Sequence, residues 1–287
     1  MSVTIIKPAP GRLDLLETVL DAVAVQPELE RLLLLRILSS EYAHRVGSGE
    51  PPRQAASETA TYLDALERMS DVRLEGLSLE GIRTLHAISR GRTEPTQFRR
   101  TSVAMRANLP GARLRLTGST PDSVAPRLEE LLSSIVRNHR LGRFEKIAFT
   151  YFELIRTHPF KDGNGRLCRL LLTTFLKNEF TSRMRIGITH LIRTNFRRYN
   201  TILRNQDANV YAQWLSYLGG MVTAELHASD RFVAIFQSLD SSDRREILKL
   251  AEEAFERVRL GDISAFSLAP DRTLSQRITS LYSSIVS

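Results

Sequence analysis

Cysteine is nearly absent from this chain: Cys168 is the only one, so no intrachain disulfide can stabilise the fold. A single free thiol is typical of proteins made in a reducing compartment. Long apolar runs are also missing. No stretch approaches the roughly 18 residues that a membrane span requires, and residues 1–20 contain no basic segment followed by an apolar one. We therefore expect a cytoplasmic protein with no membrane contact; delivery into a host as a secreted effector would leave no mark in this sequence.

Acidic residues are in deficit. Lys and Arg number 40 against 32 Asp and Glu, which gives a net charge of +8, and arginines gather in residues 90–115 and 183–204. Such a surface attracts nucleotides and acidic proteins. DNA or RNA binding is the competing explanation, but it would depend on charge alone, because the chain shows no zinc-ligand set, RNA-binding aromatic run or clear recognition helix. We do not predict a nucleic-acid partner.

Helical periodicity is what the chain does contain, without internal repeats or low-complexity tracts. With 42% hydrophobic residues it can bury a substantial core. Apolar residues recur at spacings of three and four in residues 13–38, 55–65, 79–88, 144–155 and 167–175. We therefore predict a mainly α fold. It divides into an N-terminal helical region (1–79), a core (80–225) and a C-terminal helical tail (226–287).

Residues 158–169, His-Pro-Phe-Lys-Asp-Gly-Asn-Gly-Arg-Leu-Cys-Arg, form the most informative segment and lie between two of these helical patterns. Pro159 disfavours helical backbone at the preceding residue, so His158 is predicted to stand at or just past the end of the first helix. With an ordinary pKa near 6.5, a histidine can take a proton from a hydroxyl near neutral pH. Asp162 is the lone carboxylate and suits Mg²⁺, which usually takes one or two carboxylates plus substrate phosphate oxygens.

The second half of the segment suits phosphate. Gly163 and Gly165 permit φ > 0 and close approach, so consecutive backbone N–H groups can point at one anion. A helix predicted to begin at Gly165 or Arg166 adds the positive end of its dipole. Arg166 and Arg169 lie three positions apart, hence on one helical face, and offer two forked cations. Asn164 can donate a hydrogen bond to a phosphoryl oxygen.

This segment resembles the motif of the Fic family, H-x-F-x-(D/E)-G-N-G-R-x-x-R, at all eight specified positions. The matched residues are His158, Phe160, Asp162, Gly163, Asn164, Gly165, Arg166 and Arg169. The resemblance covers roughly residues 80–225 and implies a Fic-type helical bundle with a small β-hairpin flap. It also implies an enzyme that transfers AMP from ATP to a Ser, Thr or Tyr hydroxyl of a protein target and releases pyrophosphate.

The resemblance assigns roles to the matched residues. His158 would be the general base and Asp162 the Mg²⁺ ligand. Asn164 would contact the α-phosphate. The other contacts to the phosphates of ATP would come from backbone donors at Gly163 and Gly165 and from the side chains of Arg166 and Arg169.

The segment shares features with three other kinds of site. A calcium loop would need an oxygen ligand where Arg166 stands and a closing Glu where Thr173 stands. A Walker A loop would end in Lys-Ser or Lys-Thr, which is missing. A purely structural helix-loop-helix leaves the spacing of both arginines unexplained. Two alternatives stay open: transfer of another nucleotide or phosphate-containing group, and a non-catalytic nucleotide- or protein-binding module.

Two short β-like runs, residues 102–106 and 113–117, precede the segment and are separated by a stretch containing Asn108-Leu109-Pro110-Gly111. They predict a hairpin, with an ordinary surface loop as the alternative. The resemblance implies that this flap, around residues 102–117, docks the protein target by strand addition.

Beyond the segment, residues 195–200 and Trp214 resemble the pattern that follows the core helix in Fic proteins. Tyr199 and Asn200 are candidates for stacking and hydrogen bonding at adenine, with coverage of the core as an equal alternative. Trp214 is predicted to be a core residue. His86 receives no role.

Many Fic proteins inhibit themselves through an (S/T)-x-x-x-E-(G/N) helix, whose Glu pairs with the second arginine of the motif. Residues 39–44, Ser-Ser-Glu-Tyr-Ala-His, resemble the usual place for that helix, but Ala43 and His44 replace Glu and Gly. Because a neutral alanine cannot hold Arg169, we predict weak or absent self-inhibition by this route. Glu41, out of register, and a separate inhibitory partner are the alternatives.

Overall fold

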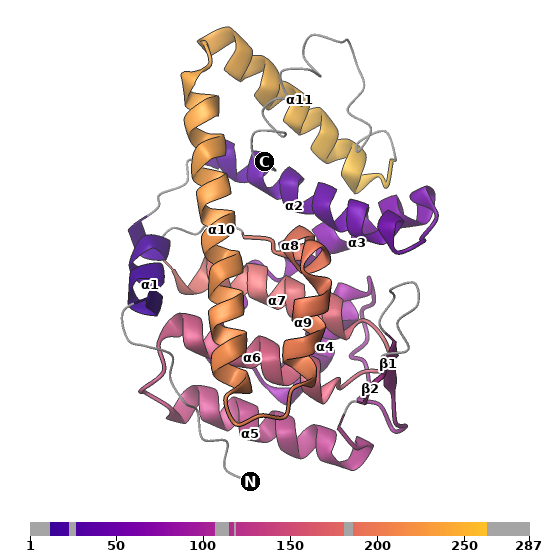
Figure 1. Cartoon of the computed structure of the whole chain (residues 1–287). Coiled ribbons are helices and arrows are strands. Elements are labelled where there is room, and N and C mark those ends of the chain that lie inside the picture. Colours follow the sequence, from indigo (N-terminus) through magenta and orange to yellow (C-terminus); the bar gives the residue numbers. More distant parts are fainter. Residues whose placement is uncertain (1–11, 23–26, 107–114, 118, 181–185, 263–287) are drawn as a thin grey trace.

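Helices make up nearly all regular structure in the computed structural model, which describes residues 12–22, 27–106, 115–117, 119–180 and 186–262 (Figure 1). The predicted mainly α fold is therefore confirmed. The helices are α1 (Arg12–Ala22), α2 (Pro27–Gly47), α3 (Pro52–Arg68), α4 (Leu79–Ser89), α5 (Val124–Arg137), α6 (Arg143–Thr157), α7 (Asn164–Glu179), α8 (Thr189–Thr194), α9 (Phe196–Arg204), α10 (Val210–Ser238) and α11 (Ser241–Arg259). Two 3₁₀ turns, η1 (Leu74–Gly76) and η2 (Pro121–Ser123), and the strands β1 (Ala104–Arg106) and β2 (Arg115–Thr117) complete the described elements.

The core is built around α6 and α7, the two helices that the segment 158–169 joins. Their large apolar side chains, such as Phe144 of α6 and Phe175 of α7, are almost completely buried. Trp214 of α10 is also fully buried, and its indole N–H donates to the carbonyl of Ala148 at 2.9 Å. Its predicted core position is thus confirmed. α10 thus packs on α6, and the loop between α6 and α7 begins at a closely packed helix.

The N- and C-terminal regions cover this core together. α2 packs against α3, and α11 packs against both (Figure 1). Arg36 of α2 reaches both carboxylate oxygens of the buried Glu225 in α10, each at 2.7 Å. The boundary expected at residue 225 falls inside α10, which runs unbroken from Val210 to Ser238. All three predicted regions contribute to one apolar cluster.

A two-stranded antiparallel hairpin stands between α4 and α5. β1 pairs with β2 in the register Ala104 to Thr117, Met105 to Leu116 and Arg106 to Arg115. The predicted hairpin is confirmed, and the turn proposed at residues 108–111 lies outside the described residues. Figure 1 places the hairpin beside the core helices, close to the loop that follows α6.

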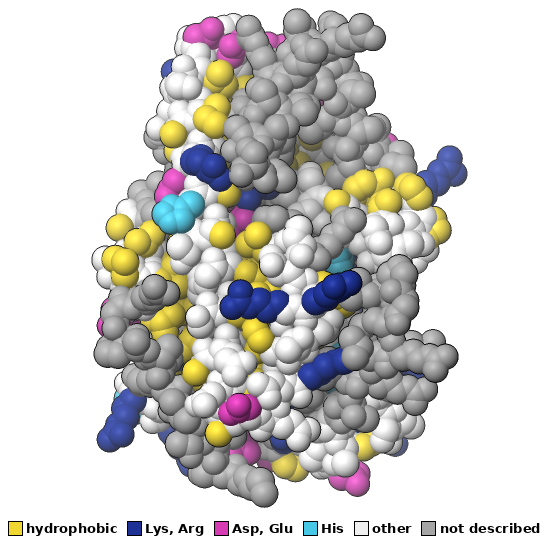
Figure 2. Space-filling view, in the orientation of Figure 1, with side chains coloured by type: hydrophobic (Ala, Val, Ile, Leu, Met, Phe, Trp, Pro, Cys, Tyr) yellow, Lys and Arg dark blue, Asp and Glu magenta, His cyan; other side chains and the backbone are white. Residues whose placement is uncertain are grey.

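The described residues contain no helix that could span a membrane, and the basic side chains drawn on one face of the molecule are dispersed. Within the described ranges, no helix combines the length and apolar character needed to cross a bilayer. On the face shown in Figure 2, the drawn Lys and Arg side chains stand at separate points.

Candidate active site

His158 stands at the end of α6. It is the C-cap residue and has φ 51°, the only positive φ of a non-glycine residue among those described. The prediction that Pro159 would place it just past the helix is confirmed. Its ring Nδ1 lies 3.4 Å from the carbonyl of Ile155, so Nδ1 carries the proton and Nε2 keeps its lone pair. Burial lowers the pKa of His158, and the charge of Arg99 adds to this effect, which keeps the imidazole neutral near pH 7.

α7 begins at Asn164, one residue before the predicted start, with Gly163 as its N-cap at φ 82°. A Cβ at Gly163 would lie 2.9 Å from His86 Nε2, so both conformation and space require glycine there. Gly165 lies within the helix, so the expectation of positive φ at both glycines is wrong for Gly165. The first N–H groups of α7 have no partner within the helix, which makes this end a site for anions.

The loop is closed by Phe160 and Asn164. Phe160 is fully buried. The Asn164 amide accepts from the Phe160 N–H at 2.9 Å and donates to the Phe160 carbonyl at 2.8 Å. A contact between Asn164 and phosphate stays a prediction, because in this structure the side chain holds the two ends of the loop together.

α4 supports the loop from outside, through residues to which sequence reasoning assigned no role. The His86 ring stacks on Phe160 with centroids 3.7 Å apart, and its Nε2 lies 2.8 Å from the carbonyl of Asp162. Burial lowers the pKa of His86 to about 4, so the ring is neutral and donates this bond. One turn further along, Arg90 lies 3.3 Å from the Asp162 carboxylate. The i, i+4 spacing of His86 and Arg90 was the available signal.

Asp162 fits the predicted role of a Mg²⁺ ligand. Its side chain is 80% exposed, and its partner Arg90 is also solvent-accessible. Exposed ion pairs of this kind are worth only about 0–1 kcal/mol, so the carboxylate is available to a cation. Within the described residues no cluster of three or more His, Cys, Asp or Glu could hold a metal. One carboxylate nevertheless suits Mg²⁺, which takes its remaining ligands from phosphate and water.

Both motif arginines are held by carboxylates from the N-terminal region. Glu41 of α2 accepts from Arg169 Nε at 2.7 Å and from Nη2 at 3.1 Å. Glu58 of α3 pairs with Arg166 through its carboxylate, and its carbonyl accepts from Arg166 Nη2 at 2.8 Å. We call these two contacts the carboxylate latch. They place negative oxygens where the resemblance expects the outer phosphates of a nucleotide.

The Glu41 contact corrects the premise that no carboxylate of this helix holds Arg169. Its effect on activity stays a prediction. Alanine does stand at residue 43, but Glu41, half a turn earlier on α2, provides the carboxylate. Glu41 is completely buried and also accepts from the hydroxyl of Thr189. Burial would raise its pKa, but the charge and hydrogen bonds of Arg169 and the Thr189 hydroxyl hold the pKa lowered, at about 2. The group is therefore charged at all physiological pH values, and the out-of-register alternative is the one that the structure contains.

The Glu58 contact was not foreseen and has no sequence signal. Arg166 is nearly inaccessible, and burial together with the nearby Arg45 lowers its pKa to about 10. Arg45 lies 3.7 Å from Glu58 and 3.1 Å from Glu50, so a small charge network surrounds this half of the latch. Arg166 Nε is buried and has no hydrogen-bond partner in the described part of the chain, so one donor of this guanidinium is free for a ligand.

Tyr199 and Asn200 lie on α9 and are both buried. The Tyr199 hydroxyl is 3.3 Å from that of Tyr151, and its ring meets Trp214 edge-on at 5.9 Å. Burial raises the pKa of the Tyr199 hydroxyl, and the charge of Arg169 partly opposes this rise. Asn200 Nδ2 is buried without a partner among the described residues. Tyr199 packs in the core, and contacts of either residue with adenine stay a prediction.

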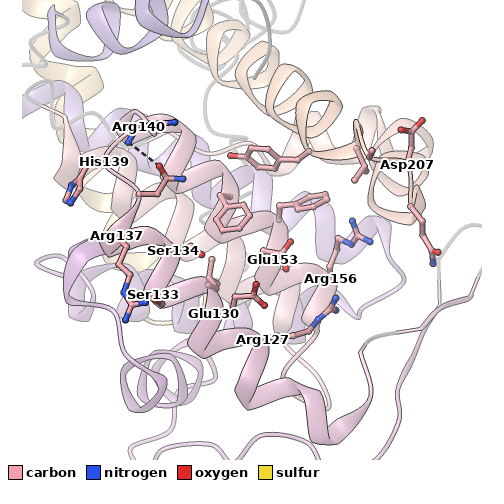
Figure 3. Close-up of a pocket in the computed structure, with 18 residues that line it drawn as sticks. Arg127, Glu130, Ser133, Ser134, Arg137, His139, Arg140, Glu153, Arg156 and Asp207 are labelled. Carbon is pink, nitrogen blue, oxygen red and sulfur yellow. Dashed lines mark hydrogen bonds between the residues drawn. The ribbon is translucent and has the colours of Figure 1, made fainter. Parts of the chain in front are cut away.

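A separate cleft of about 1040 Å³ runs along α5 and α6. Figure 3 shows Arg127 and Arg156 at one end, Arg137 and Arg140 at the other, and glutamates between them. None of the eight motif residues lines it. Because its charges alternate in sign, this cleft is less suited to a polyphosphate than the N-terminus of α7.

Comparison with known proteins finds similarity to Fic proteins. The Fic/DOC family model matches residues 76–176. The protein adenylyltransferase Fic of Drosophila grimshawi is 32% identical over 106 residues, a match that covers 35% of this chain and only 20% of that relative's length.

Two solved structures share the fold. A Fic family protein from Desulfovibrio desulfuricans superposes with a TM-score of 0.64 at 18% identity, covering 91% of this chain and 90% of that one. A signaling protein from Bacteroides thetaiotaomicron that contains the same kind of domain gives 0.55 at 16% identity, covering 76% and 95%. At 18% and 16% identity, these similarities show a shared fold.

Proposed function

We propose, from the match of residues 76–176 to the Fic/DOC family model, that this protein is an adenylyltransferase that transfers AMP from ATP to a hydroxyl group of a protein target. One observation carries the proposal: the same loop holds a neutral His158 and leads into the N-terminus of α7. Arg166 and Arg169 lie on the first turns of that helix. The name of the Drosophila relative supports the same reaction, over a fifth of that relative's length.

His158 acts as the general base in this proposal. The target hydroxyl oxygen attacks the α-phosphorus of ATP, and the hydroxyl proton passes to Nε2 of His158. The bond between the α-phosphorus and the oxygen bridging to the β-phosphate breaks, and pyrophosphate leaves. The lowered pKa of His158 favours the neutral imidazole that this step needs.

The phosphates would be held by the end of α7. Its unpaired N–H groups and dipole stabilise the charge that develops on the α-phosphate. Arg166 and Arg169 would bind the outer phosphates, and Asp162 would hold Mg²⁺, which when bound would neutralise the charge that develops on the phosphates. Tyr199 and Asn200 are the candidates for the adenine.

The carboxylate latch defines a resting state in this proposal. Glu41 occupies Nε and Nη2 of Arg169, and Glu58 occupies both Nη atoms of Arg166. In the proposal these carboxylates compete with the outer phosphates for the same N–H groups, so both must move away before ATP binds productively. Both carboxylates belong to the same chain as the arginines. The proposal therefore requires no separate inhibitory partner.

The hairpin is the proposed docking element for the target. Its strands are short and lie beside the loop, and an edge strand can recruit a partner backbone through main-chain hydrogen bonds. Strand addition makes little demand on sequence, so the identity of the target depends on other surfaces.

The direct test uses Mg²⁺ with ATP labelled either at the α- or at the γ-phosphate. The protein should be assayed as wild type, as Glu41→Gln, and as the double variant Glu41→Gln with His158→Ala. Transfer of AMP predicts label on protein from the α-position only, stronger in Glu41→Gln and lost in the double variant. Detection is by autoradiography of the protein itself and of added lysate.

The alternatives give different patterns. Label from the γ-position would indicate phosphoryl transfer, and label from another nucleotide would indicate a different donor. If folded Glu41→Gln transfers no group from any nucleotide but binds one tightly, the protein is a binding module and the enzymatic proposal is wrong.

A further inference from the structure

Arg99 lies outside the motif, in the segment that leads from α4 to β1, and its side chain is only 6% exposed. Buried guanidinium groups are normally paired with carboxylates, but within the described residues none accompanies it. Instead it donates to four backbone carbonyls. These belong to Thr101, Ser119, Thr157 and His158.

Two of these carbonyls end α6. Arg99 Nε donates to the carbonyl of His158 at 2.7 Å, and Nη2 donates to that of Thr157 at 3.2 Å. The backbone N–H of Arg99 donates to the carbonyl of Pro159 at 2.9 Å. Carbonyls at a helix C-terminus lack partners within the helix and favour a positive charge nearby. Arg99 therefore holds three successive peptide groups of the chain in place.

These contacts fall where the backbone is least relaxed. His158 has left-handed φ, which residues with a Cβ adopt only at a cost in energy. Such a conformation persists only where its surroundings determine it. Arg99 holds the carbonyl of His158 at 2.7 Å and is thus one of the contacts that surround this strained residue.

The other two carbonyls belong to the feet of the hairpin. Arg99 Nη1 donates to the carbonyl of Thr101, which precedes β1, at 3.1 Å, and Nη2 donates to the carbonyl of Ser119, which follows β2. Ser119 adds a second link, because its hydroxyl donates to the carbonyl of Thr157 at 2.9 Å. One planar group thus joins both ends of the hairpin to the end of α6.

We propose that Arg99 is a positioning residue that couples the hairpin to His158, so that a target strand added to the hairpin and the base that receives its proton are held in one frame. This inference rests on the proposed function for the identities of base and target. The coupling itself depends only on the contacts. A shift of either hairpin foot changes the guanidinium plane, and with it the carbonyl of His158.

The same guanidinium acts on the titration of His158. Burial lowers the pKa of His158 most, and the hydrogen bond to the carbonyl of Ile155 raises it. Of the charged side chains that face the imidazole, Arg99 lowers this pKa and Asp162 raises it. Replacing Arg99 by a neutral residue should therefore raise the pKa of His158. Replacing it by lysine keeps the charge but cannot reach four carbonyls with one planar fork.

The first experiment needs no activity. The pKa of His158 is followed by NMR of the histidine rings in wild type, Arg99→Gln and Arg99→Lys, with His158→Gln to assign the signal. Arg99→Gln is expected to raise the pKa of His158, while Arg99→Lys keeps it lowered. Arg100→Gln, at the exposed neighbouring position, is the matched control and should leave it unchanged. An unchanged pKa of His158 in folded Arg99→Gln would overturn the coupling.

The second experiment measures AMP transfer against pH in the Glu41→Gln background. Both Arg99 variants are expected to lose kcat by at least about tenfold while KM for ATP changes less than about twofold, because the base and not the nucleotide is displaced. The acid limb of the pH profile should move to higher pH in Arg99→Gln only.

The outcomes separate the two proposals. If no variant transfers any group but the backbone amide signals of Thr101, Ser119 and His158 shift together in Arg99→Lys and stay in place in Arg100→Gln, the coupling stands and the proposed function fails. If transfer occurs and kcat is unchanged in both Arg99 variants, the coupling is wrong and the proposed function stands. Should Arg99→Gln not fold, Arg99→Lys alone decides through kcat and KM.

Discussion

Single residues in the loop are determined by their immediate neighbours. Gly163 must be glycine because its φ is positive and because His86 occupies the space that a Cβ would need. His86 in turn is held between Phe160, on which it stacks, and the carbonyl of Asp162, to which it donates. The neutral ring is thus part of the loop, and protonation would place an unpaired charge in a buried site.

The first prediction concerns the pH dependence of His86. Burial lowers the pKa of His86 from about 6.5 to about 4. The stability that the neutral ring contributes is therefore fully present above pH 6.5, falls progressively as the pH drops from 6.5, and is lost once the pH falls through 4. The loss amounts to about 3 kcal/mol. In His86→Gln, which keeps a donor but does not titrate, this part of the acid destabilisation should disappear. Urea unfolding at pH 7, 5.5 and 4.5 measures it.

The matched control is His139→Gln, at an exposed position in the turn between α5 and α6. It is expected to follow the wild-type pH dependence. Equal losses of unfolding free energy in wild type and in His86→Gln on acidification would contradict the role given to His86.

At the scale of elements, α2 is a structural helix that, in the proposed function, also obstructs the nucleotide. Arg36 fixes it to Glu225 of α10, and Glu41 fixes it to Arg169 of α7. Removing one partner of a buried ion pair is expensive because the other charge stays buried, typically about 3–5 kcal/mol. The latch therefore links the docking of α2 to the state of the phosphate site.

The second prediction is that Glu41→Gln binds ATP with Mg²⁺ at least about tenfold more tightly than wild type, a difference of about 1.4 kcal/mol. The carboxylate no longer competes with phosphate for Arg169. Without ligand the variant should unfold at a lower temperature, and ATP should raise its Tm more than that of wild type. Isothermal titration calorimetry and thermal unfolding measure the two effects.

Glu50→Gln is the control, since Glu50 pairs with Arg45 and not with a motif arginine. It should leave ATP affinity unchanged. Equal affinity in wild type and folded Glu41→Gln would show that Glu41 does not occlude the phosphate site.

The loop was predictable from sequence, and the latch was not, for one physical reason. Every contact that shapes the loop from within, such as Asn164 with Phe160, joins residues a few positions apart, so spacing encodes it. Glu58 and Glu41 meet their arginines across 108 and 128 positions. The packing of α2 and α3 on α7 decides those contacts. A motif search placed the inhibitory residue at position 43, whereas the packed helix presents Glu41.

At the scale of the whole molecule, the fold is one apolar cluster to which every predicted region contributes. Helices are present in all five runs that periodicity predicted, whereas α5, α9 and α10 were not predicted. The arrangement of the helices was not predictable either, because α11 packs on α2 and α3 although long stretches of chain separate them. Destabilising substitutions in the C-terminal helices should therefore also lower the stability of the N-terminal region.

The third prediction tests this cooperativity through the only tryptophan. Trp214→Phe leaves space in the core and removes the donor to the buried carbonyl of Ala148. It should cost about 2 kcal/mol of unfolding free energy while keeping a single transition. Circular dichroism in urea measures this, since the fluorescent residue is lost. Leu260→Ala, at a position that is 83% exposed, is the control and should change stability by less than about 0.5 kcal/mol. Two separate transitions would contradict a single core.

The carboxylate latch also changes what a nucleotide affinity would mean. If ATP binds only when α2 has released Arg169, the observed dissociation constant is the intrinsic one divided by the fraction of molecules in which the helix is undocked. At an undocked fraction of about 1%, a phosphate site of ordinary strength would measure about a hundredfold weaker than it is. A poor affinity would then report the position of a helix and not the quality of the site, and any molecule that binds the undocked face of α2 would act as an activator without touching the loop.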